Sequence, residues 1–421
     1  MADRVAVLGA GISGQAASRL AKASGAEVCV YDENGAGDQT EFSETSIEQN
    51  DLFILSPGFA AQHPWRRLIT HSKKRFYGEL GYAASHWKGR LFAVTGTNGK
   101  TTLTQFIAEA LKNAGEDVFP VGNIGMPFSD LVLSDANQKD AIAVCEVSSF
   151  QAELTHGLAL DLLLWSNFAE DHLDRYSSMS EYFAAKVNLL ASLKSGASCL
   201  LGARVPSWFR KFGIEIPPSA VVVDDDLLPT ALGQHSPFSR FPHSKNFQIA
   251  AALWGQMDLP VSSLIKTANE FQLAPHRMTL VHQLGNVCFW DDSKATNFHA
   301  TLAALEATDG PVYWIGGGQG KGGDIQSFVN TAACRISSAY LYGDVGPSLG
   351  FFFEKTDIKA EVFRPFSDAV TAACLDALRA GSGNVLLSPG FSSFDQFSSY
   401  SERGESFTSL VLGLNESTTA R

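Results

Sequence analysis

Short apolar runs alternate with helical patterns along the whole chain. The runs at 141–145, 162–165, 287–290 and 385–387 are apolar at nearly every position, which is typical of strands buried on both faces of a parallel sheet. Segments with apolar residues at helical spacing lie between such runs. This succession predicts an α/β fold built from βαβ units, in which ligands bind at the carboxyl ends of the strands.

Three of the apolar runs lead directly into glycine-rich loops, which suggests three domains. The loops are GAGISG at 9–14, GTNGK at 96–100 and GGGQGK at 316–321. We predict an N-terminal Rossmann-like half-fold at 1–88, a central P-loop ATPase-type parallel sheet at 89–274 and a C-terminal Rossmann-like domain at 275–421. The stretch 203–242, which is rich in Pro and Ser, is expected to be an irregular insert.

Composition and charge narrow the class of protein. The net charge of -12 over 421 residues argues against a nucleic-acid partner, because phosphate backbones require clustered Lys and Arg. The six cysteines are scattered, which predicts reduced thiols. No apolar stretch approaches the roughly 18 residues of a membrane span, and glycines interrupt the first apolar run. We therefore expect a cytoplasmic protein without membrane insertion.

The loop GTNGKTT at 96–102 is the most specific motif. Its backbone N–H groups can surround phosphates, Lys100 adds a positive charge, and a Thr hydroxyl can ligate Mg²⁺. Val94 stands where the general P-loop pattern has its first Gly. A helix with an apolar stripe from Leu103 to Leu111 should follow and end at Gly115. Strand, loop and helix together predict a nucleotide-binding site.

The first loop, Gly9 to Gly14, has the spacing of a dinucleotide-binding turn. A second strand, 27–31, ends in Asp32, which could approach a sugar or a base. The loop is equally compatible with a Rossmann-like turn that binds no nicotinamide cofactor. A segment ending near residue 88 is short for a dinucleotide fold and suits the diphosphate of a single nucleotide better.

Ionisable residues follow two strands of the central segment. Glu146 ends the run 141–145, where a carboxylate near a phosphate loop is a natural Mg²⁺ ligand. The cluster 170–175 could bind metal and phosphate or could be a solvated turn. In a helix predicted from about Ser180, with Phe183, Val187, Leu190 and Leu193 as its apolar residues, Lys186 does not lie on the outer face. Such a lysine needs a partner, a modification or a path by which its amine reaches solvent.

The last segment carries polar residues just after its strands, which indicates a shared cleft for an anionic small molecule. They occur in PHR at 275–277, DSKATN at 292–297, the third glycine loop with Lys321, and the run SPG to SFDQF between 388 and 397. Each alone could be a helix cap or a turn.

With these motifs assembled, the chain resembles the Mur ligase family, and within it the members that add D-glutamate. The resemblance spans the chain in order and rests on GTNGKTT at 96–102, EVSSFQ at 146–151, EDHLDRY at 170–176, PHR at 275–277, DDSKATN at 291–297 and the SPG to ERG run at 388–404. It implies an ATP- and Mg²⁺-dependent ligase of peptidoglycan precursor synthesis that forms an acyl phosphate. The implied substrates are UDP-N-acetylmuramoyl-L-alanine and D-glutamate, and a monomer is expected.

The resemblance also implies roles for individual residues. Lys100, His172 and Lys186 would be catalytic, and the metal ligands would be Thr101, Glu146, His172 and a carbamylated Lys186. ATP would be bound by Gly96, Thr97, Asn98, Gly99, Lys100, Thr101, Thr102, Arg277 and Asp292. The UDP substrate would be bound by Gly11, Ile12, Ser13, Gly14, Asp32, Ser56 and Asn123. D-Glutamate would be bound by Lys294, Thr296, Lys321, Ser393, Phe394 and Tyr400.

One family motif is degenerate here. Around residues 243–252 the asparagines are out of register, and Gln248 is the substitute expected to contact adenine. Two alternatives within the enzyme class are a sister Mur ligase with another amino acid and a folylpolyglutamate-synthase-like ligase, although the latter lacks the N-terminal domain. An alternative of another class is a Rossmann and P-loop nucleotide-binding switch.

Overall fold

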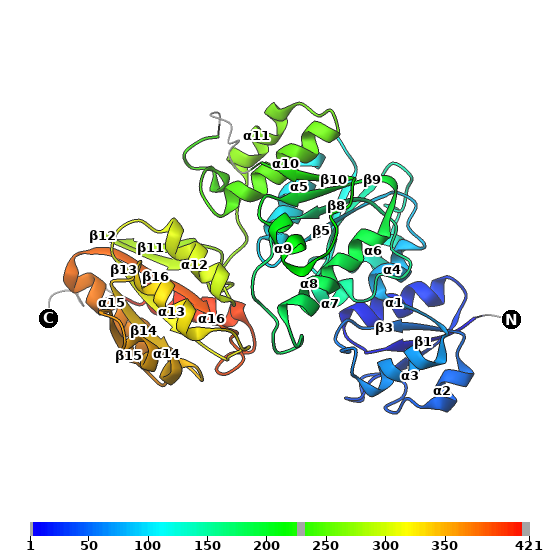
Figure 1. Cartoon of the computed structure of the whole chain (residues 1–421), viewed down its shortest axis with the longest axis horizontal. Coiled ribbons are helices and arrows are strands. Elements are labelled where there is room, and N and C mark those ends of the chain that lie inside the picture. The colour runs from blue at the N-terminus through cyan, green and yellow to red at the C-terminus, as the bar shows by residue number, and fades with distance from the viewer. Residues whose placement is uncertain (1–2, 225–231, 415–421) are drawn as a thin grey trace. The chain divides into compact units, whose positions relative to one another are not determined.

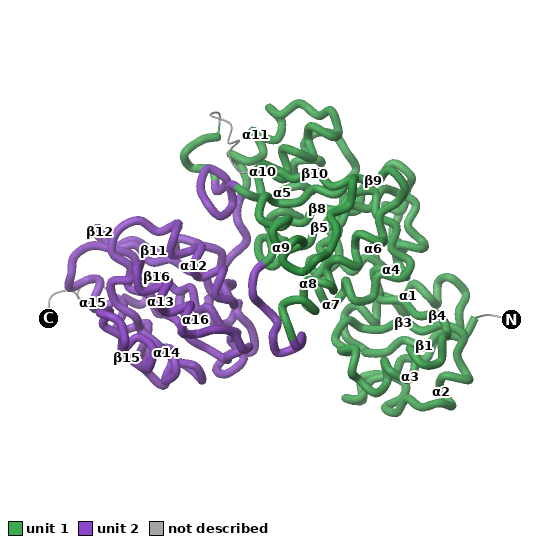
Figure 2. Tube along the Cα trace, viewed as in Figure 1, with its two compact units in different colours: residues 1–168, 178–236, 245–271 green, residues 169–177, 237–244, 272–421 purple. Residues whose placement is uncertain are grey.

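The structure is a computed structural model that describes residues 3–224 and 232–414 (Figure 1). The part of the predicted insert at 225–231 thus lies outside the described residues. Contacts divide the chain into two compact units, shown in Figure 2. Unit 1 contains 1–168, 178–236 and 245–271, whereas unit 2 contains 169–177, 237–244 and 272–421. The predicted α/β class is confirmed, because the described sheets are built mainly from parallel strands.

Unit 1 begins with a parallel sheet of order β2-β1-β3-β4. Strand β3 is buried at every position because its residues are apolar on both faces. The register pairs Leu8 with Tyr31 and with Leu55, so the loops after these strands emerge at one edge. The elements are β1 (Arg4–Leu8), α1 (Ile12–Ala23), β2 (Glu27–Tyr31), α2 (Glu44–Gln49), β3 (Leu52–Leu55), α3 (Pro64–Ser72), β4 (Arg75–Gly78) and α4 (Glu79–Ala84).

A second parallel sheet follows in unit 1, with the order β10-β9-β8-β5-β7-β6. Its central strand β5 leads into helix α5, whose predicted stripe from Leu103 to Leu111 is fully buried and which ends before Gly115. The elements are β5 (Arg90–Thr95), α5 (Lys100–Asn113), β6 (Val118–Gly122), α6 (Phe128–Leu133), β7 (Ile142–Glu146), α7 (Ser149–Ala152), β8 (Leu160–Trp165), α8 (Met179–Val187), η1 (Asn188–Ser192), β9 (Leu193–Gly202), α9 (Val205–Phe212), β10 (Ala220–Val223), α10 (His243–Gln256), which begins in unit 2, and α11 (Val261–Glu270).

The prediction of an irregular insert at 203–242 is wrong at 205–212, which form helix α9, and at 220–223, which form strand β10. Helix α9 packs Phe209 against Phe183 and Trp165, at ring-centroid distances of 4.9 and 5.6 Å. Gly213, at φ 67°, ends the helix in a left-handed conformation. Strand β10 then adds a parallel edge to the sheet. The aromatic residues of a short amphipathic helix supply the packing that the Pro and Ser content concealed.

The predicted helix around Lys186 is shorter than expected. Helix α8 ends at Val187, and Leu190 lies in the tighter helix η1. Leu193 begins β9, where it pairs with Leu160, so sheet pairing overrides the helical spacing of this leucine.

Unit 2 contains a six-stranded sheet of order β11-β12-β16-β13-β14-β15. Its strands are parallel except at one edge, where β11 and β12 form an antiparallel hairpin around Gly285. Helices cover both faces (Figure 1). The elements are η2 (Pro237–Ser239), β11 (Thr279–Leu284), β12 (Asn286–Asp291), α12 (Phe298–Ala307), β13 (Val312–Gly317), α13 (Ile325–Ala333), β14 (Ser338–Tyr342), α14 (Gly346–Phe353), β15 (Lys359–Val362), α15 (Phe366–Ala380), β16 (Ser382–Gly390) and α16 (Tyr400–Leu412).

The predicted domain boundaries near 88 and 274 fall between sheets, and they stay predictions. Among the described residues, no helix is both long and apolar enough to cross a membrane.

The close contact between β1 and α1 makes a testable prediction about Gly14. A Cβ at Gly14 would lie 1.8 Å from the Gly9 carbonyl oxygen, whereas a Cβ at Gly11 would meet nothing within 4 Å. Gly14→Ala should therefore lower the stability of unit 1 by roughly 1–3 kcal/mol or more. Gly11→Ala is the matched control and should change stability little. Thermal unfolding of both variants checks this, and equal midpoints for the two would contradict it.

Candidate active site

The glycine loop after β5 has a backbone that only glycine adopts readily. Gly96 has φ 151°, and a Cβ there would lie 2.1 Å from the Ser166 hydroxyl oxygen. Gly99, at φ 76°, caps the N-terminus of α5. The Asn167 side chain holds this loop, because its Oδ1 accepts hydrogen bonds from the N–H groups of Thr97 and Asn98 at 3.2 and 2.9 Å. The loop is therefore a fixed set of backbone dipoles at a helix N-terminus, the kind of site that binds phosphate.

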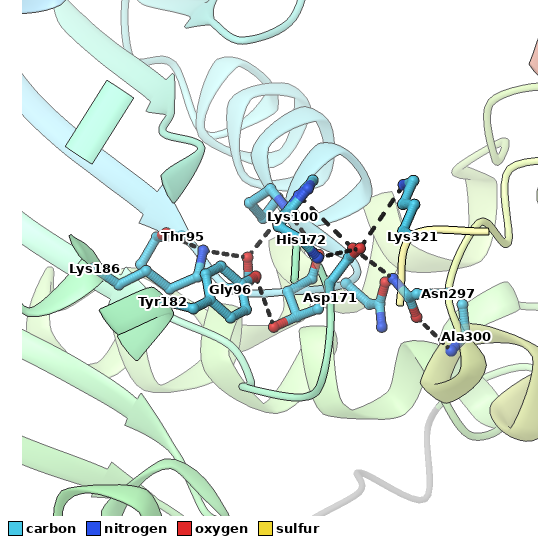
Figure 3. Close-up of polar contacts among 12 residues, drawn as sticks. Thr95, Gly96, Lys100, Asp171, His172, Tyr182, Lys186, Asn297, Ala300 and Lys321 are labelled. Carbon is cyan, nitrogen blue, oxygen red and sulfur yellow. Dashed lines mark hydrogen bonds and ion pairs between the residues drawn. The ribbon is translucent and has the colours of Figure 1, made fainter. Parts of the chain in front are cut away.

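Two lysine amines converge on one carbonyl of this loop (Figure 3). Lys100 Nζ donates to the carbonyl oxygens of Gly96 and Thr97 at 3.0 and 2.8 Å. Lys186 Nζ donates to the same Gly96 oxygen at 2.8 Å and reaches Thr95 Oγ1 at 3.4 Å. Lys186 is only 1% exposed, so the prediction that it lies off the outer face is confirmed. A positive charge at this depth is costly unless neighbouring groups or a modification stabilise it.

Tyr182 completes the surroundings of Lys186. The Lys186 amine lies 5.1 Å from the centre of the Tyr182 ring, and the Tyr182 hydroxyl is 3.1 Å from Thr97 Oγ1. One helix, α8, thus supplies both an amine and a phenol to the loop. Sequence reasoning selected Lys186 and missed Tyr182, although both lie on the buried side of α8, one turn apart.

Glu146, at the end of β7, is 1% exposed. Its Oε1 accepts a hydrogen bond from the Asn123 amide at 2.9 Å, whereas its Oε2 has no hydrogen-bond partner within the described residues. Buried carboxylate oxygens in folded proteins are almost always paired with a donor or a cation. A Mg²⁺ ion would supply that partner, and so this carboxylate fits the predicted metal site.

Asn246, on α10, contacts the same glycine loop. Its Nδ2 donates to the Gly99 carbonyl at 3.3 Å. Gln248, the predicted substitute for an adenine contact, is buried two positions further along the helix. The asparagine out of register in the sequence therefore reaches the loop in space, and the role of Gln248 stays a prediction.

Unit 2 contains a small pocket beside Asp171, lined by residues 170–173, 296–298, 321–322 and 390–391. Asp171 lies 3.8 Å from Lys321 Nζ, accepts from the Asn297 amide at 3.0 Å, and has a side chain only 8% exposed (Figure 3). Burial acts to raise the pKa of Asp171, but Lys321 and His172 outweigh it and hold the pKa below its ordinary value. The carboxylate is therefore ionised at neutral pH and holds the Lys321 amine.

Arg277 stands between two residues with left-handed backbones, His276 at φ 64° and Met278 at φ 46°. Such conformations are uncommon outside glycine and need support from their surroundings. Two neighbouring carboxylates provide it. Asp291 lies 2.6 Å from His276 Nδ1, and Asp292 accepts from the Met278 N–H at 3.2 Å.

Lys294 and Tyr400 form a close pair, with the lysine amine 3.5 Å from the centre of the ring. Burial acts to raise the pKa of Tyr400, but the neighbouring Lys294 outweighs it and lowers that pKa. Of the residues predicted for D-glutamate, Thr296 and Lys321 line the pocket beside Asp171. Ser393 is buried, whereas Phe394 is 67% exposed, and neither residue is among those that line this pocket.

Near the first glycine loop, Asp32 is engaged by backbone. Its Oδ2 accepts from the Ala10 N–H at 2.8 Å and its Oδ1 from the Asn34 N–H at 3.0 Å. These bonds, that from Ala10 first, lower the pKa of Asp32. Ile12 is 77% exposed at the start of α1, and Ser13 helps to line a second small pocket with Pro57 and Gln151. The roles predicted for Gly11, Ile12, Ser13, Gly14, Asp32, Ser56 and Asn123 stay predictions.

Comparison with known proteins identifies the family. The family described as Mur ligase middle domain matches residues 94–220. A UDP-N-acetylmuramoylalanine–D-glutamate ligase of Gloeobacter violaceus is 33% identical, with 97% of this chain and 99% of that protein covered. A ligase of the same name from Phenylobacterium zucineum is also 33% identical, with 97% of this chain and 95% of that protein covered. The chain belongs to the Mur ligase family.

Solved structures support the fold. MurF ligase from Thermotoga maritima, determined in complex with ADP, gives a TM-score of 0.60 at 14% identity and covers 88% of this chain and 91% of its own. UDP-N-acetylmuramate-alanine ligase MurC from Thermotoga maritima gives a TM-score of 0.58 at 15% identity and covers 97% of this chain and 99% of its own. The family predicted from the motifs is confirmed by the relatives at 33% identity.

The predicted metal ligands of this Mur ligase belong to both units, with Thr101, Glu146 and Lys186 in unit 1 and His172 in unit 2. Among the described residues, no three His, Cys, Asp or Glu side chains gather as a metal site would require. The predicted set contains only two such side chains, since its remaining ligands are a hydroxyl and a modified lysine. It stays a prediction.

Asp292 gives this Mur ligase a testable dependence of stability on pH. Burial raises the pKa of Asp292 from 3.8 to about 7, while its bonds from Ser388 and Met278 act to lower it. Between these two values the folded chain keeps a proton that the unfolded chain has lost, so stability falls as pH rises, by at most about 1.4 kcal/mol per pH unit.

Asp292→Asn removes this titration and keeps a carbonyl acceptor. The thermal midpoint of the variant minus that of the wild type should increase as pH rises from 4 to 7. Above pH 7 this difference should be constant. A difference that is constant from pH 4.5 to 8 would contradict the raised pKa.

Proposed function

We propose that this Mur ligase joins D-glutamate to UDP-N-acetylmuramoyl-L-alanine at the expense of ATP, in the synthesis of peptidoglycan precursors. The observation that carries the proposal is the 33% identity, over nearly the whole of both chains, to ligases named for this activity. The six free cysteines and the absence of a membrane-spanning helix in the described residues are compatible with a cytoplasmic monomer, which we also propose.

The reaction must first activate a carboxylate, since a carboxylate is a poor electrophile. The L-alanyl carboxylate attacks the γ-phosphate of ATP, which releases ADP and leaves an acyl phosphate. The amine of D-glutamate then attacks the carbonyl carbon, loses a proton, and phosphate leaves as the amide forms. Catalysis consists mainly of positioning and charge neutralisation.

The glycine loop after β5 supplies both positioning and charge neutralisation for the nucleotide. We assign ATP to Gly96, Thr97, Asn98, Gly99, Lys100, Thr101 and Thr102, with Arg277 and Asp292 acting from unit 2. The Lys100 amine, which donates to two carbonyls of this loop, is assigned to the phosphates as a positive charge. Mg²⁺ would be held by Thr101, Glu146, His172 and carbamylated Lys186. It would supply further positive charge to neutralise the phosphates.

The amino-acid pocket is assigned to unit 2. A dicarboxylate needs at least two cations or strong donors, and Lys294 and Lys321 provide two positive charges. Thr296 lines the pocket beside Lys321, and we assign Ser393, Phe394 and Tyr400 to the same substrate.

Phosphate release with a panel of amino acids tests the specificity. With ATP and UDP-N-acetylmuramoyl-L-alanine present, D-glutamate should support far faster release than a diamino acid or than L-alanine, which has no second carboxylate for the second lysine. Lys321→Ala should raise the KM for D-glutamate by roughly tenfold or more, given a charge-assisted bond of about 1.5–3 kcal/mol, and leave the KM for ATP nearly unchanged. Lys355→Ala, an exposed lysine of the same unit, is the control. Faster release with another amino acid would refute D-glutamate as the substrate.

Carbamylation of Lys186 makes a second prediction. Lys186→Ala should lower kcat by about 100-fold or more, because a carboxylate at the metal is lost. Acetate or formate should restore part of the rate in this variant. Neither should change the rate of Lys194→Ala, a lysine paired with Asp161 nearer the surface. A carbamate resonance in ¹³C NMR of the wild type under ¹³CO₂ should vanish in Lys186→Ala, and a wild type without it would contradict the assignment.

A further inference from the structure

Arg403, in the second turn of α16, is fully buried at 0% exposure. Its guanidinium donates four hydrogen bonds, all to uncharged oxygens. Nε reaches Ser293 Oγ at 2.9 Å and Nη2 reaches the Ser293 carbonyl at 2.8 Å. Nη1 reaches the Phe391 carbonyl at 3.2 Å and the Tyr342 hydroxyl at 3.3 Å. This residue belongs to the ERG motif at 402–404, to which the proposed function gives no role.

The charge of Arg403 has no ion-pair partner among the described carboxylates. The acidic side chains of the surrounding loops either pair with another group or have a raised pKa, which disfavours their charged form. Asp291 pairs with His276, and burial raises the pKa of Asp395. A buried guanidinium normally has a carboxylate beside it, because removal from water costs several kcal/mol per ion. Unit 2 therefore holds a positive charge in its interior that no described carboxylate neutralises by direct contact.

The bonds of Arg403 connect the segments assigned to the amino acid. Ser293 precedes Lys294, and its Oγ also donates to the Tyr400 carbonyl at 2.8 Å. Phe391 lies two residues before Ser393. Tyr342 accepts from the Gly318 N–H at 3.3 Å, at the start of the loop that carries Lys321. Each of these segments stands at the carboxyl end of one of four adjacent strands, β12, β16, β13 and β14, or at the start of α16.

We propose that Arg403 is a positioning residue for the amino-acid site and that its buried charge favours a substrate with two carboxylates. This inference rests on the proposed function. By joining the four loops, the guanidinium fixes the spacing of Lys294, Lys321 and Ser393. Its charge acts through an interior of low polarity, where electrostatic interactions extend further than in water. An amino acid with two carboxylates has a net negative charge that balances this charge, whereas a neutral analogue of the same shape does not.

Replacement of Arg403 in the full-length enzyme separates charge from packing. Arg403→Gln and Arg403→Met remove the charge, and Arg403→Lys retains it. Arg379→Met, an exposed arginine of α15 with a side chain 69% exposed, is the matched control. Tyr342→Phe removes one acceptor of Arg403 and leaves its charge. Circular dichroism and thermal unfolding establish which variants fold.

Each folded variant is assayed for the KM of D-glutamate, the KM of ATP, kcat, and the inhibition constant of D-glutamine as a neutral competitor. The KM for D-glutamate should rise about tenfold or more in the neutral variants, the effect of losing one favourable charge interaction. It should rise by no more than about threefold in Arg403→Lys. D-Glutamine binding and the KM for ATP should change much less. If Arg403→Met does not fold, the KM values for D-glutamate of Arg403→Lys and Arg403→Gln are compared instead.

The inference is overturned if the neutral and lysine variants raise the KM for D-glutamate equally, or if D-glutamine binding weakens as much as D-glutamate binding. A wild type that prefers another amino acid in the phosphate-release panel would refute the proposed specificity instead. The two failures are therefore distinguishable in the same assay.

Discussion

The carbonyl oxygen of Gly96 accepts hydrogen bonds from two lysine amines, and the site in unit 1 is organised around this shared acceptor. One amine comes from the helix that starts at the loop, and the other comes from α8, which follows a different strand. Two positive charges can stay this close only where a strong acceptor and further neighbours hold them. Carbamylation of Lys186, as proposed above, would replace one of these two positive charges by a negative one and remove the repulsion between them.

The same local architecture is used three times for different purposes. After β1, Gly14 allows α1 to lie against the Gly9 carbonyl. After β5, Gly96 and Gly99 open a ring of N–H groups held by Asn167. After β13, Gly318 allows the loop to approach the Ser392 carbonyl, where an added Cβ would lie 2.2 Å away. The glycines after β1 and β13 therefore permit close backbone approach, whereas Gly96 leaves room for the Ser166 hydroxyl.

Much of the fold and part of the site could be predicted from the chain itself. Strands, glycine loops and the helix after Gly99 depend on neighbours in sequence, so local pattern was sufficient for them. The structural roles of Asn167, Asn246 and Arg403 were missed because their partners lie in segments far along the chain. The bonds from Asn167 to Asn98, from Asn246 to Gly99 and from Arg403 to Tyr342 span 69, 147 and 61 positions. Sheet pairing moved Leu193 out of a helix, and aromatic packing made α9 a helix in a stretch rich in Pro and Ser.

The contact between Asp171 and Lys321 changes what substrate binding means in unit 2. If Lys321 binds a substrate carboxylate as proposed, the chain already carries a carboxylate tethered next to it. A tethered group acts as a competitor at high effective concentration, so the substrate exchanges for Asp171 and does not meet a free cation. Only the difference between the two ion pairs then contributes to affinity. The expected result is modest binding with rapid release, which suits a site that must accept a small metabolite and let its product go.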